Sequence, residues 1–398
     1  MLDAAEFGPR TSDQPVRILM VSGGTGGHIF PALAVAEELR GRKGPENRGY
    51  EIEFLGTKRP LEARLVPAAG FRLHTVEAAG LKGIKGIKRL RNLWALPRTT
   101  LASAGILRAI RPKVVVGVGG YLAGPVMLEA ALVGIPTVLI EPNVRPGFTN
   151  RLLAPVVRIA ALGFAETAKV YGKKARVTGL PVRRAFFEIP ARRSRKAAEV
   201  AQSLLTVPGR TQAGVTVSPF VILVVGGSQG SRAMNQAMVK ASSLLAAGAG
   251  GMRIIHQTGE HDYNEVLKVY QELGLAAEVH AFIDDMPGMV AQADLVISRA
   301  GAMAVTELAA AGRAALLVPF PGAADQHQLE NARTMENAGA ARVIPQSELT
   351  PDRLAKEIGE LMSNPATLSR METFARGLAK PDAAARIADL VENLASKS

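Results

Sequence analysis

Residues 21–30, VSGGTGGHIF, place four glycines directly before a histidine, His28. Glycine lets a phosphate approach the backbone closely, and the free N–H groups of a helix N-terminus bind anions. Imidazole is a suitable general base near neutral pH, and the positive end of a helix dipole disfavours its protonated form. The stretch therefore predicts an anion site with a neutral base beside it. The alternative is a tight turn in which His28 only bonds local backbone or packs against the turn.

The same pattern returns in the second half of the chain. Residues 221–235, VILVVGGSQGSRAMN, again read as an apolar run, a glycine turn and the start of a helix. Neither turn matches the Walker A loop or a clean G-x-G-x-x-G fingerprint, which disfavours P-loop and nicotinamide-binding enzymes. A repeated strand, glycine turn and helix predicts two related domains that face one another across a cleft.

Two further stretches of the second half carry side chains suited to a sugar nucleotide. In residues 298–312, SRAGAMAVTELAAAG, Glu307 on the expected helix could accept both hydroxyls of a ribose, or be a solvated carboxylate. In residues 319–332, PFPGAADQHQLENA, Asp325 and Gln328 suit sugar hydroxyls, although D-x-x-Q is also a capping-box-like spacing. The chain has no D-x-D pair and no H-E-x-x-H. We therefore expect no metal and no other cofactor. If a nucleotide diphosphate leaves from this site, helix N-termini and backbone amides must absorb its charge.

These motifs follow apolar runs that alternate with helical patterns, which predicts an α/β protein with mostly parallel sheets. The expected strands span 16–21, 52–55, 114–118 and 137–140, with a weaker one at 176–178, and then 221–225, 253–256, 295–298 and 315–318. Between the two series lies the polar, basic segment 189–219, with one short expected helix over 196–205. The prediction is two doubly wound domains with ligands at the carboxyl ends of their strands.

The composition narrows the function classes. The chain has 398 residues, no cysteine and a formal net charge of +13, so disulfide scaffolds and thiolate chemistry are excluded and an anionic partner is favoured. The chain shows no recognised nucleic-acid motif and is only 5% aromatic, so we expect no nucleic-acid partner. The N-terminus does not resemble a signal peptide, and the apolar runs are too short to span a bilayer, which predicts a soluble, cytoplasmic protein.

Residues 80–98, GLKGIKGIKRLRNLWALPR, interleave basic and apolar side chains and include Lys85, Lys88 and the chain's one tryptophan, Trp94. This pattern is typical of a segment that binds an anionic membrane surface. The alternative is an ordinary helix that packs its leucines on the core and leaves its lysines in water.

Taken together, eight motifs of the chain resemble those of a known enzyme family. In order along the chain they are GGTGGHIFPALAVAEEL, GGYLAGP, EPNVRPGFTNR, GLPVR, VVGGSQGSR, FIDDM, SRAGAMAVTEL and PFPGAADQHQLENA. This order resembles the MurG family, bacterial enzymes that transfer N-acetylglucosamine (GlcNAc) from UDP-GlcNAc to undecaprenyl-pyrophosphoryl-MurNAc-pentapeptide. The reaction converts lipid I to lipid II in peptidoglycan synthesis, which serves cell wall biogenesis, cell shape and cell division.

The resemblance implies the GT-B fold, with two Rossmann-like domains facing a cleft. Residues 1–182 with 382–398 would form the acceptor- and membrane-facing domain, which includes a returning C-terminal helix. Residues 183–381 would form the UDP-GlcNAc-binding domain.

The resemblance also implies roles for individual residues. The catalytic base would be His28, with Glu141 as the alternative. The implied UDP-GlcNAc contacts are Thr25, Gly26, Gly27, Asn143, Arg183, Ser228, Ile283, Met303, Thr306, Glu307 and Gln328, with Ile283 meeting the uracil through its backbone. Tyr121, Lys85, Lys88 and Trp94 would face the acceptor or membrane. Two residues depart from the family pattern: Leu180 replaces an asparagine and Pro142 replaces a glutamine.

The prediction is a metal-independent, inverting glycosyltransferase, peripheral on the cytoplasmic face of the bacterial inner membrane. Its expected partners are UDP-GlcNAc, the lipid-linked acceptor, the anionic membrane and proteins of cell-wall synthesis or division. The alternatives are another GT-B enzyme, such as a UDP-GlcNAc 2-epimerase or a transferase for a soluble acceptor, and a non-catalytic UDP-sugar-binding membrane scaffold.

Overall fold

The structure is a computed structural model that describes residues 15–23, 26–44, 48–76, 95–192, 219–246, 251–323 and 326–397. Within these ranges the side chains of residues 95–102, 121 and 246 are not described. The chain divides into two compact units, one of Met1–Pro181 with Asp382–Ser398 and one of Val182–Pro381.

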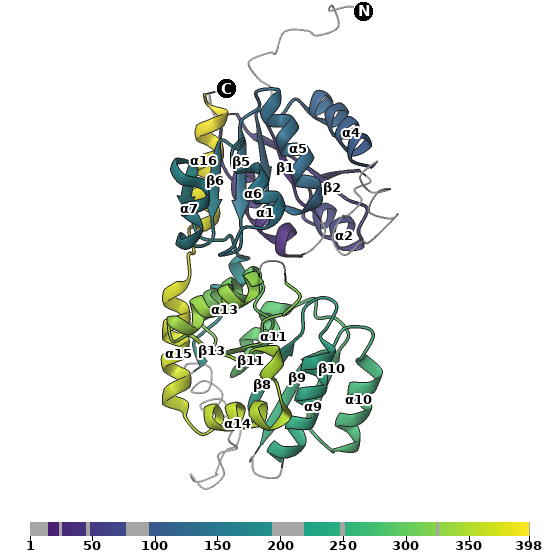
Figure 1. Cartoon of the computed structure of the whole chain (residues 1–398), viewed down its shortest axis with the longest axis vertical. Coiled ribbons are helices and arrows are strands. Elements are labelled where there is room, and N and C mark those ends of the chain that lie inside the picture. Colours follow the sequence, from purple (N-terminus) through teal and green to yellow (C-terminus); the bar gives the residue numbers. More distant parts are fainter. Residues whose placement is uncertain are drawn as a thin grey trace, which may run out of the picture. The chain divides into compact units, whose positions relative to one another are not determined.

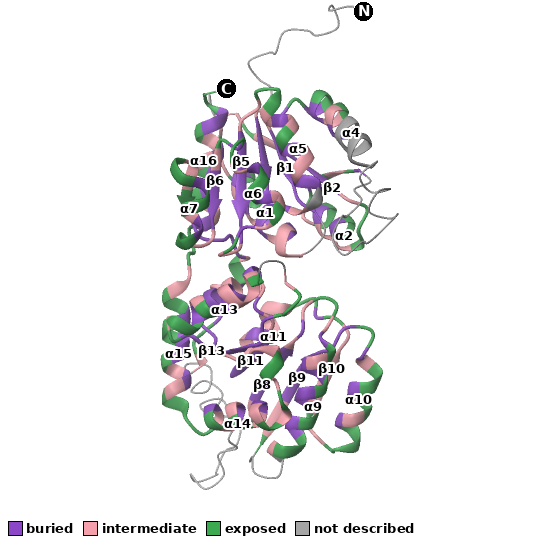
Figure 2. Ribbon diagram, viewed as in Figure 1, coloured by how far each residue is buried: buried purple, intermediate pink, exposed green. Residues whose placement is uncertain are grey.

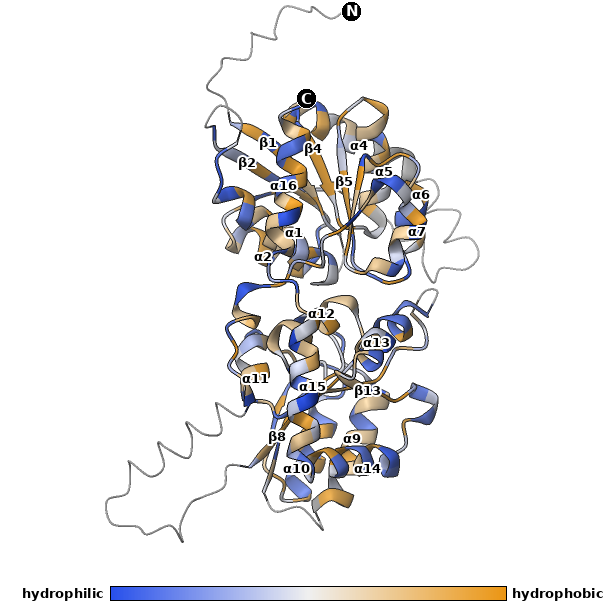
Figure 3. Ribbon diagram, turned by 90° about the vertical axis from the view of Figure 1, so that its left-hand side faces the viewer, coloured by the Kyte–Doolittle hydropathy of each residue, from blue (hydrophilic) through white to orange (hydrophobic). Residues whose placement is uncertain are grey.

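The first unit is a doubly wound parallel sheet (Figure 1). Its described residues form seven strands in the order β3-β2-β1-β4-β5-β6-β7. The strands are β1 (Val16–Val21), β2 (Tyr50–Gly56), β3 (Arg72–Thr75), β4 (Val114–Gly117), β5 (Thr137–Glu141), β6 (Ile159–Leu162) and β7 (Ala175–Val177). The helices are α1 (Gly26–Arg40), α2 (Pro60–Ala68), α4 (Ala95–Ile110), α5 (Gly120–Leu132), α6 (Phe148–Leu153), α7 (Ala168–Tyr171) and α16 (Ala383–Ala395). Figure 3 shows the sheet between α1, α2 and α16 on one side and α4, α5 and α6 on the other.

The second unit repeats this plan. Its described residues form a six-stranded parallel sheet in the order β10-β9-β8-β11-β12-β13. The strands are β8 (Phe220–Val225), β9 (Met252–Gln257), β10 (Ala277–His280), β11 (Leu295–Ser298), β12 (Ala315–Leu317) and β13 (Ala341–Val343). The helices are α9 (Arg232–Ala246), α10 (Tyr263–Glu272), α11 (Met286–Gln292), α12 (Ala302–Ala311), α13 (His327–Asn337), α14 (Pro351–Met362) and α15 (Pro365–Leu378). Short 3-10 helices span Ala165–Thr167, Gly172–Lys174, Arg184–Phe186 and Gln346–Glu348.

The central strands of both sheets are apolar and buried, as Figure 2 shows, because helices cover both faces of each sheet. The predicted α/β class with two Rossmann-like parallel sheets is confirmed, and each expected strand is present with ends shifted by two residues at most. The predicted strand list lacks four strands, β3, β6, β10 and β13. All four are three or four residues long, and β3, β10 and β13 are outer strands. The expected helix over 196–205 and most of the basic segment 80–98 lie outside the described residues.

The C-terminal helix α16 returns to the first unit and packs against α1. Arg42, just after α1, donates from Nη1 to Asp389 at 2.6 Å and to Glu392 at 2.9 Å, both on α16. It also donates to the backbone oxygen of Ala385 at 3.1 Å. One guanidinium group therefore binds three residues of the last helix, and this fastens the chain's end to the first unit.

Candidate functional site

In the first unit three of the predicted site residues, Gly26, Gly27 and His28, lie where the strand order reverses. β1 lies between β2 and β4, so the segments leaving β1 and β4 diverge at the switch point where doubly wound sheets bind ligands. Gly26, Gly27 and His28 form the first turn of α1. Gly120 begins α5 at a φ of 85°, and a Cβ there would lie 2.9 Å from the Gly23 carbonyl oxygen. Only glycine lets the two turns approach this closely.

The structure does not describe the side chains of five other predicted residues of this unit. Tyr121 is the second residue of α5, but its side chain is not described. Thr25, Lys85, Lys88 and Trp94 lie outside the described residues. The expected roles of these five residues stay predictions.

Glu141 ends β5 and is fully buried. Its Oε1 accepts hydrogen bonds from the backbone N–H of Asn143 at 2.9 Å and from Asn143 Nδ2 at 3.3 Å. Its Oε2 accepts from Asn150 Nδ2 at 2.7 Å. Thr167 Oγ1 holds the same loop by donating to the carbonyl oxygen of Asn143 at 3.1 Å. Glu141 therefore holds Asn143 through two hydrogen bonds, and its predicted role as the alternative base stays a prediction.

Burial raises the pKa of Glu141 from its ordinary value of 4.5 to about 7, although hydrogen bonds from Asn143 and Asn150 oppose the shift. In the unfolded chain the Glu141 carboxyl group loses its proton at a lower pH than in the folded chain. The free energy of unfolding therefore falls as pH rises from about 4.5 to about 7. The expected loss is at most about 3 kcal/mol. We expect Glu141→Gln to remove this loss, because glutamine does not titrate. Urea unfolding of both proteins at pH 5 and pH 8 measures the difference, and an identical pH dependence would contradict the assignment.

The second unit has the matching switch point, between β8 and β11. Ser228 is exposed in the turn after β8, where Gly227 has a φ of 93°. β11 is followed by α12, with Gly301 before its first turn and Met303 and Thr306 on the helix. The N-termini of α9 and α12 thus follow the two strands that flank the switch point, an arrangement suited to a diphosphate.

Glu307 on α12 is paired with Arg183, whose Nη2 lies 3.1 Å from the carboxylate oxygen. The Glu307 side chain is only 14% exposed. Burial raises the pKa of Glu307, and the charge of Arg183 opposes the shift. The prediction assigned Arg183 to the diphosphate region and Glu307 to the ribose, and the structure brings the two side chains together.

Arg299, directly after β11, is a candidate site residue for which the sequence predicted no role. Its guanidinium group donates to Ser231 Oγ and Gln346 Oε1, both at 2.7 Å, and to the Val318 and Pro319 carbonyl oxygens. These acceptors are all neutral. Burial lowers the pKa of Arg299 to about 10, so the group stays charged at neutral pH. The sequence signal that could have indicated a role for Arg299 is its place in the SRAGA motif, at the end of a central strand.

Gln328 on α13 accepts a hydrogen bond from the backbone N–H of Phe320 at 2.9 Å. The Phe320 ring in turn lies under the Arg299 guanidinium group, 5.3 Å from ring centroid to Cζ. Asp325 lies outside the described residues. The predicted sugar residue Gln328 is therefore tied to the loop after β12, next to Arg299.

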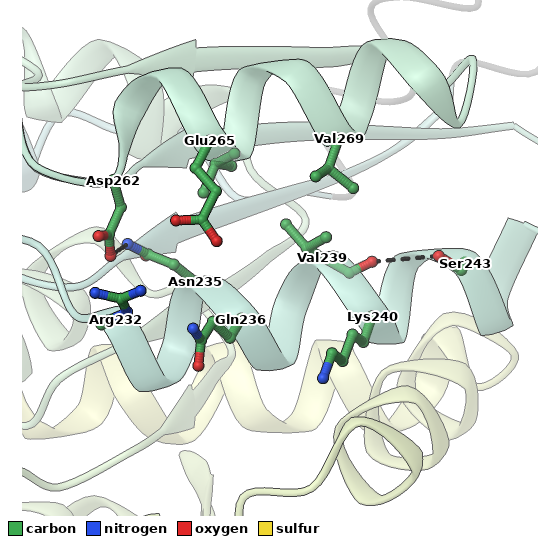
Figure 4. A pocket seen from close by; sticks show the side chains of 10 residues that line it. Arg232, Asn235, Gln236, Val239, Lys240, Ser243, Asp262, Glu265 and Val269 are labelled. Carbon is green, nitrogen blue, oxygen red and sulfur yellow. Dashed lines mark hydrogen bonds between the residues drawn. The ribbon is translucent and has the colours of Figure 1, made fainter.

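An open groove of about 430 Å³ runs along α9 and α10 (Figure 4). None of the predicted site residues lines it. Asn235 on α9 donates to Asp262 at 2.8 Å beside this groove and to the Thr258 carbonyl oxygen at 3.0 Å. Asn235 also bonds His256, whose pKa burial lowers to about 3. These buried bonds fasten the start of α9 to the end of β9.

Comparison with known proteins identifies the family. Residues 18–161 match the glycosyltransferase family 28 N-terminal domain, and residues 221–387 match the glycosyltransferase family 28 C-terminal domain. The chain belongs to glycosyltransferase family 28. Both glycine turns and both switch points fall inside the matched ranges of this family 28 protein.

Relatives within the family are similar over nearly the whole chain. The UDP-N-acetylglucosamine--N-acetylmuramyl-(pentapeptide) pyrophosphoryl-undecaprenol N-acetylglucosamine transferase of Solibacter usitatus is 42% identical over 95% of this chain and 96% of its own length. The protein with the same name from Myxococcus xanthus is 40% identical over 95% of this chain and 93% of its own length. The expected resemblance to the MurG family is thereby confirmed.

Solved structures agree with the assignment to this family. The crystal structure of Acinetobacter baumannii MurG has a TM-score of 0.73 and 32% identity, with 95% of this chain and 100% of that chain covered. A UDP-GlcNAc 2-epimerase from Neisseria meningitidis has a TM-score of 0.66 at 13% identity, with 95% of this chain and 100% of that chain covered. This second likeness shows a shared fold alone.

Proposed function

We propose that this chain transfers GlcNAc from UDP-GlcNAc to the lipid-linked muramyl pentapeptide of peptidoglycan synthesis. The observation that carries the proposal is 42% identity, over 95% of the chain, to a transferase named for this reaction. The switch points support it, because each unit places a glycine turn and a helix N-terminus where a phosphate would bind.

In the proposed reaction the acceptor hydroxyl attacks C1 of the sugar as the bond from C1 to the UDP oxygen breaks, with inversion at C1. His28 takes the proton of the attacking hydroxyl, and UDP leaves with the bonding electrons. Backbone amides at the starts of α9 and α12, together with the charge of Arg299, stabilise the departing diphosphate. Glu141 holds Asn143 in place. No metal has a role in this scheme.

We propose further that the first unit binds the cytoplasmic face of the membrane as a peripheral protein. None of the helices in the described ranges is long and apolar enough to cross a membrane. Large apolar side chains that are 43% to 77% exposed gather on the adjoining helices α5 and α6: Leu128, Leu132, Val133, Phe148 and Leu152. Exposed Arg145 precedes α6 and exposed Arg151 lies on it. Helix α4, which begins within the basic segment 80–98, packs against α5. Apolar side chains with basic neighbours suit an anionic lipid surface.

The double substitution Leu132→Ser with Phe148→Ser is expected to weaken binding to vesicles with anionic lipid at least about tenfold, because two exposed apolar side chains no longer enter the lipid. Co-sedimentation measures the change. Leu244→Ser, at an exposed leucine of the second unit, is the matched control. Equal binding by all three proteins would exclude this surface.

The proposed activity is tested by UDP release from UDP-GlcNAc, with and without a lipid-linked muramyl-pentapeptide analogue, in the presence and absence of EDTA. Release that requires the acceptor and continues in EDTA is expected. Conversion of UDP-GlcNAc to its 2-epimer would replace the proposal with an epimerase, and donor binding without turnover would leave a scaffold. Loss of release in EDTA would overturn the metal-independent mechanism.

A further inference from the structure

Gln257, the last residue of β9, is 2% exposed and uses both ends of its side-chain amide. Its Nε2 donates to the Gly227 carbonyl oxygen at 2.9 Å. Its Oε1 accepts from the backbone N–H of Ile283 at 3.0 Å. Because Gly227 offers an acceptor and Ile283 offers a donor, only one orientation of the amide satisfies both bonds.

The two backbone groups belong to two different loops. Gly227 precedes Ser228 in the turn after β8, which the proposed function assigns to the diphosphate. Ile283 lies between β10 and α11 and is the residue proposed to meet the uracil. One buried side chain therefore bonds both loops, 30 residues back and 26 residues forward along the chain.

The residues after Gln257 make further contacts with both of these loops. The backbone N–H groups of Thr258 and Gly259 donate to the carbonyl oxygens of His280 and Ala281 at 2.9 Å and 3.1 Å. On the other side, a Cβ at Gly230 would overlap the Thr258 carbonyl, so the turn after β8 lies directly against the end of β9. The buried bonds of Asn235 hold the same end of β9 to α9. The surroundings of Gln257 are fixed from both sides, which leaves its amide little freedom to rearrange.

We propose that Gln257 is a positioning residue for the donor: it sets the loop that binds the uracil end of UDP relative to the loop that binds the diphosphate end. The inference rests on the proposed function, because it takes Ser228 and Ile283 as contacts of UDP. A ligand that spans both loops needs them held at one separation, whereas a ligand that meets one loop does not. The bridge therefore contributes to UDP affinity more than to uridine affinity.

The test compares UDP and uridine binding to the full chain, by calorimetry and competition, in three variants. Gln257→Met keeps the side-chain length and removes both bonds. Gln257→Glu keeps the acceptor for Ile283 and places a carboxylate oxygen against the Gly227 carbonyl. Gln292→Met is the control, since Gln292 on α11 also uses both ends of its amide, accepting from Arg253 on β9 and donating to the Gly288 carbonyl oxygen of its own helix.

Both Gln257 variants are expected to raise the dissociation constant of UDP at least about tenfold and that of uridine less than about threefold. Gln292→Met is expected to change neither dissociation constant. Equal losses for UDP and uridine, or UDP binding unchanged in the Gln257 variants, would overturn the positioning role while the unaltered protein still binds UDP. Failure of the unaltered protein to bind UDP would instead remove the proposed function and this inference together.

Discussion

Replacing His28 with alanine is expected to lower kcat by about 10² to 10⁴ and to leave the dissociation constant of UDP unchanged. His28 lies in the first turn of α1, at the switch point of the first unit, whereas the proposed UDP contacts on α12 belong to the second unit. A base contributes to the chemical step, so its loss appears in kcat. Alanine is a good helix former, and the substitution does not disturb the buried stripe of α1.

The pH profile separates His28 from the alternative base, Glu141. If His28 is the base, the fall in kcat at acid pH disappears in His28→Ala, and added imidazole restores part of the activity. If Glu141 is the base, whose pKa burial raises to about 7, the acid fall persists in His28→Ala and disappears in Glu141→Gln. His261→Ala, at an exposed histidine of the second unit, is the control. Activity of His28→Ala within tenfold of the unaltered protein would exclude the base role.

The elements around these residues were predictable because their signals are local. A run such as 16–21 is apolar over its whole length, so the strand and the glycine turn after it follow from neighbouring residues alone. Outer strands such as β10 (AEVH) lack that signal, since half-buried edge positions accept polar residues. Local pattern therefore predicts the centre of each sheet better than its edges.

The contacts within the candidate site were not predictable in the same way, because they join residues far apart in the chain. Arg299 reaches Ser231 across 68 residues and Gln346 across 47 residues. Likewise, nothing in the sequence around Glu141 indicates that Asn150 will bury and bond its carboxylate. Residue type and position after a strand predicted where the polar groups lie. The hydrogen-bond partner of each group could be identified only in the folded chain.

Replacing Glu307 with glutamine is expected to weaken UDP binding about 30-fold to 1,000-fold. A carboxylate that accepts from two ribose hydroxyls makes two charge-assisted hydrogen bonds, and their loss costs about 2 to 4 kcal/mol. The substitution also leaves the Arg183 guanidinium group without its carboxylate partner at 3.1 Å. Glu272→Gln, at an exposed carboxylate paired with Lys268 on α10, is the control and is expected to bind UDP normally.

A ribose role for Glu307 is separated from a structural one by 2′-deoxy-UDP. The unaltered protein is expected to prefer UDP over this analogue about tenfold, because one of the two hydroxyl bonds is missing, and Glu307→Gln is expected to lose most of that preference. Arg183→Met is expected to weaken binding of both ligands and keep the preference. Burial raises the pKa of Glu307, so the unaltered protein should also lose UDP affinity as pH falls through that raised value, while Glu307→Gln should not. A preference that survives in Glu307→Gln would assign the ribose to another residue and leave Glu307 as the partner that holds Arg183.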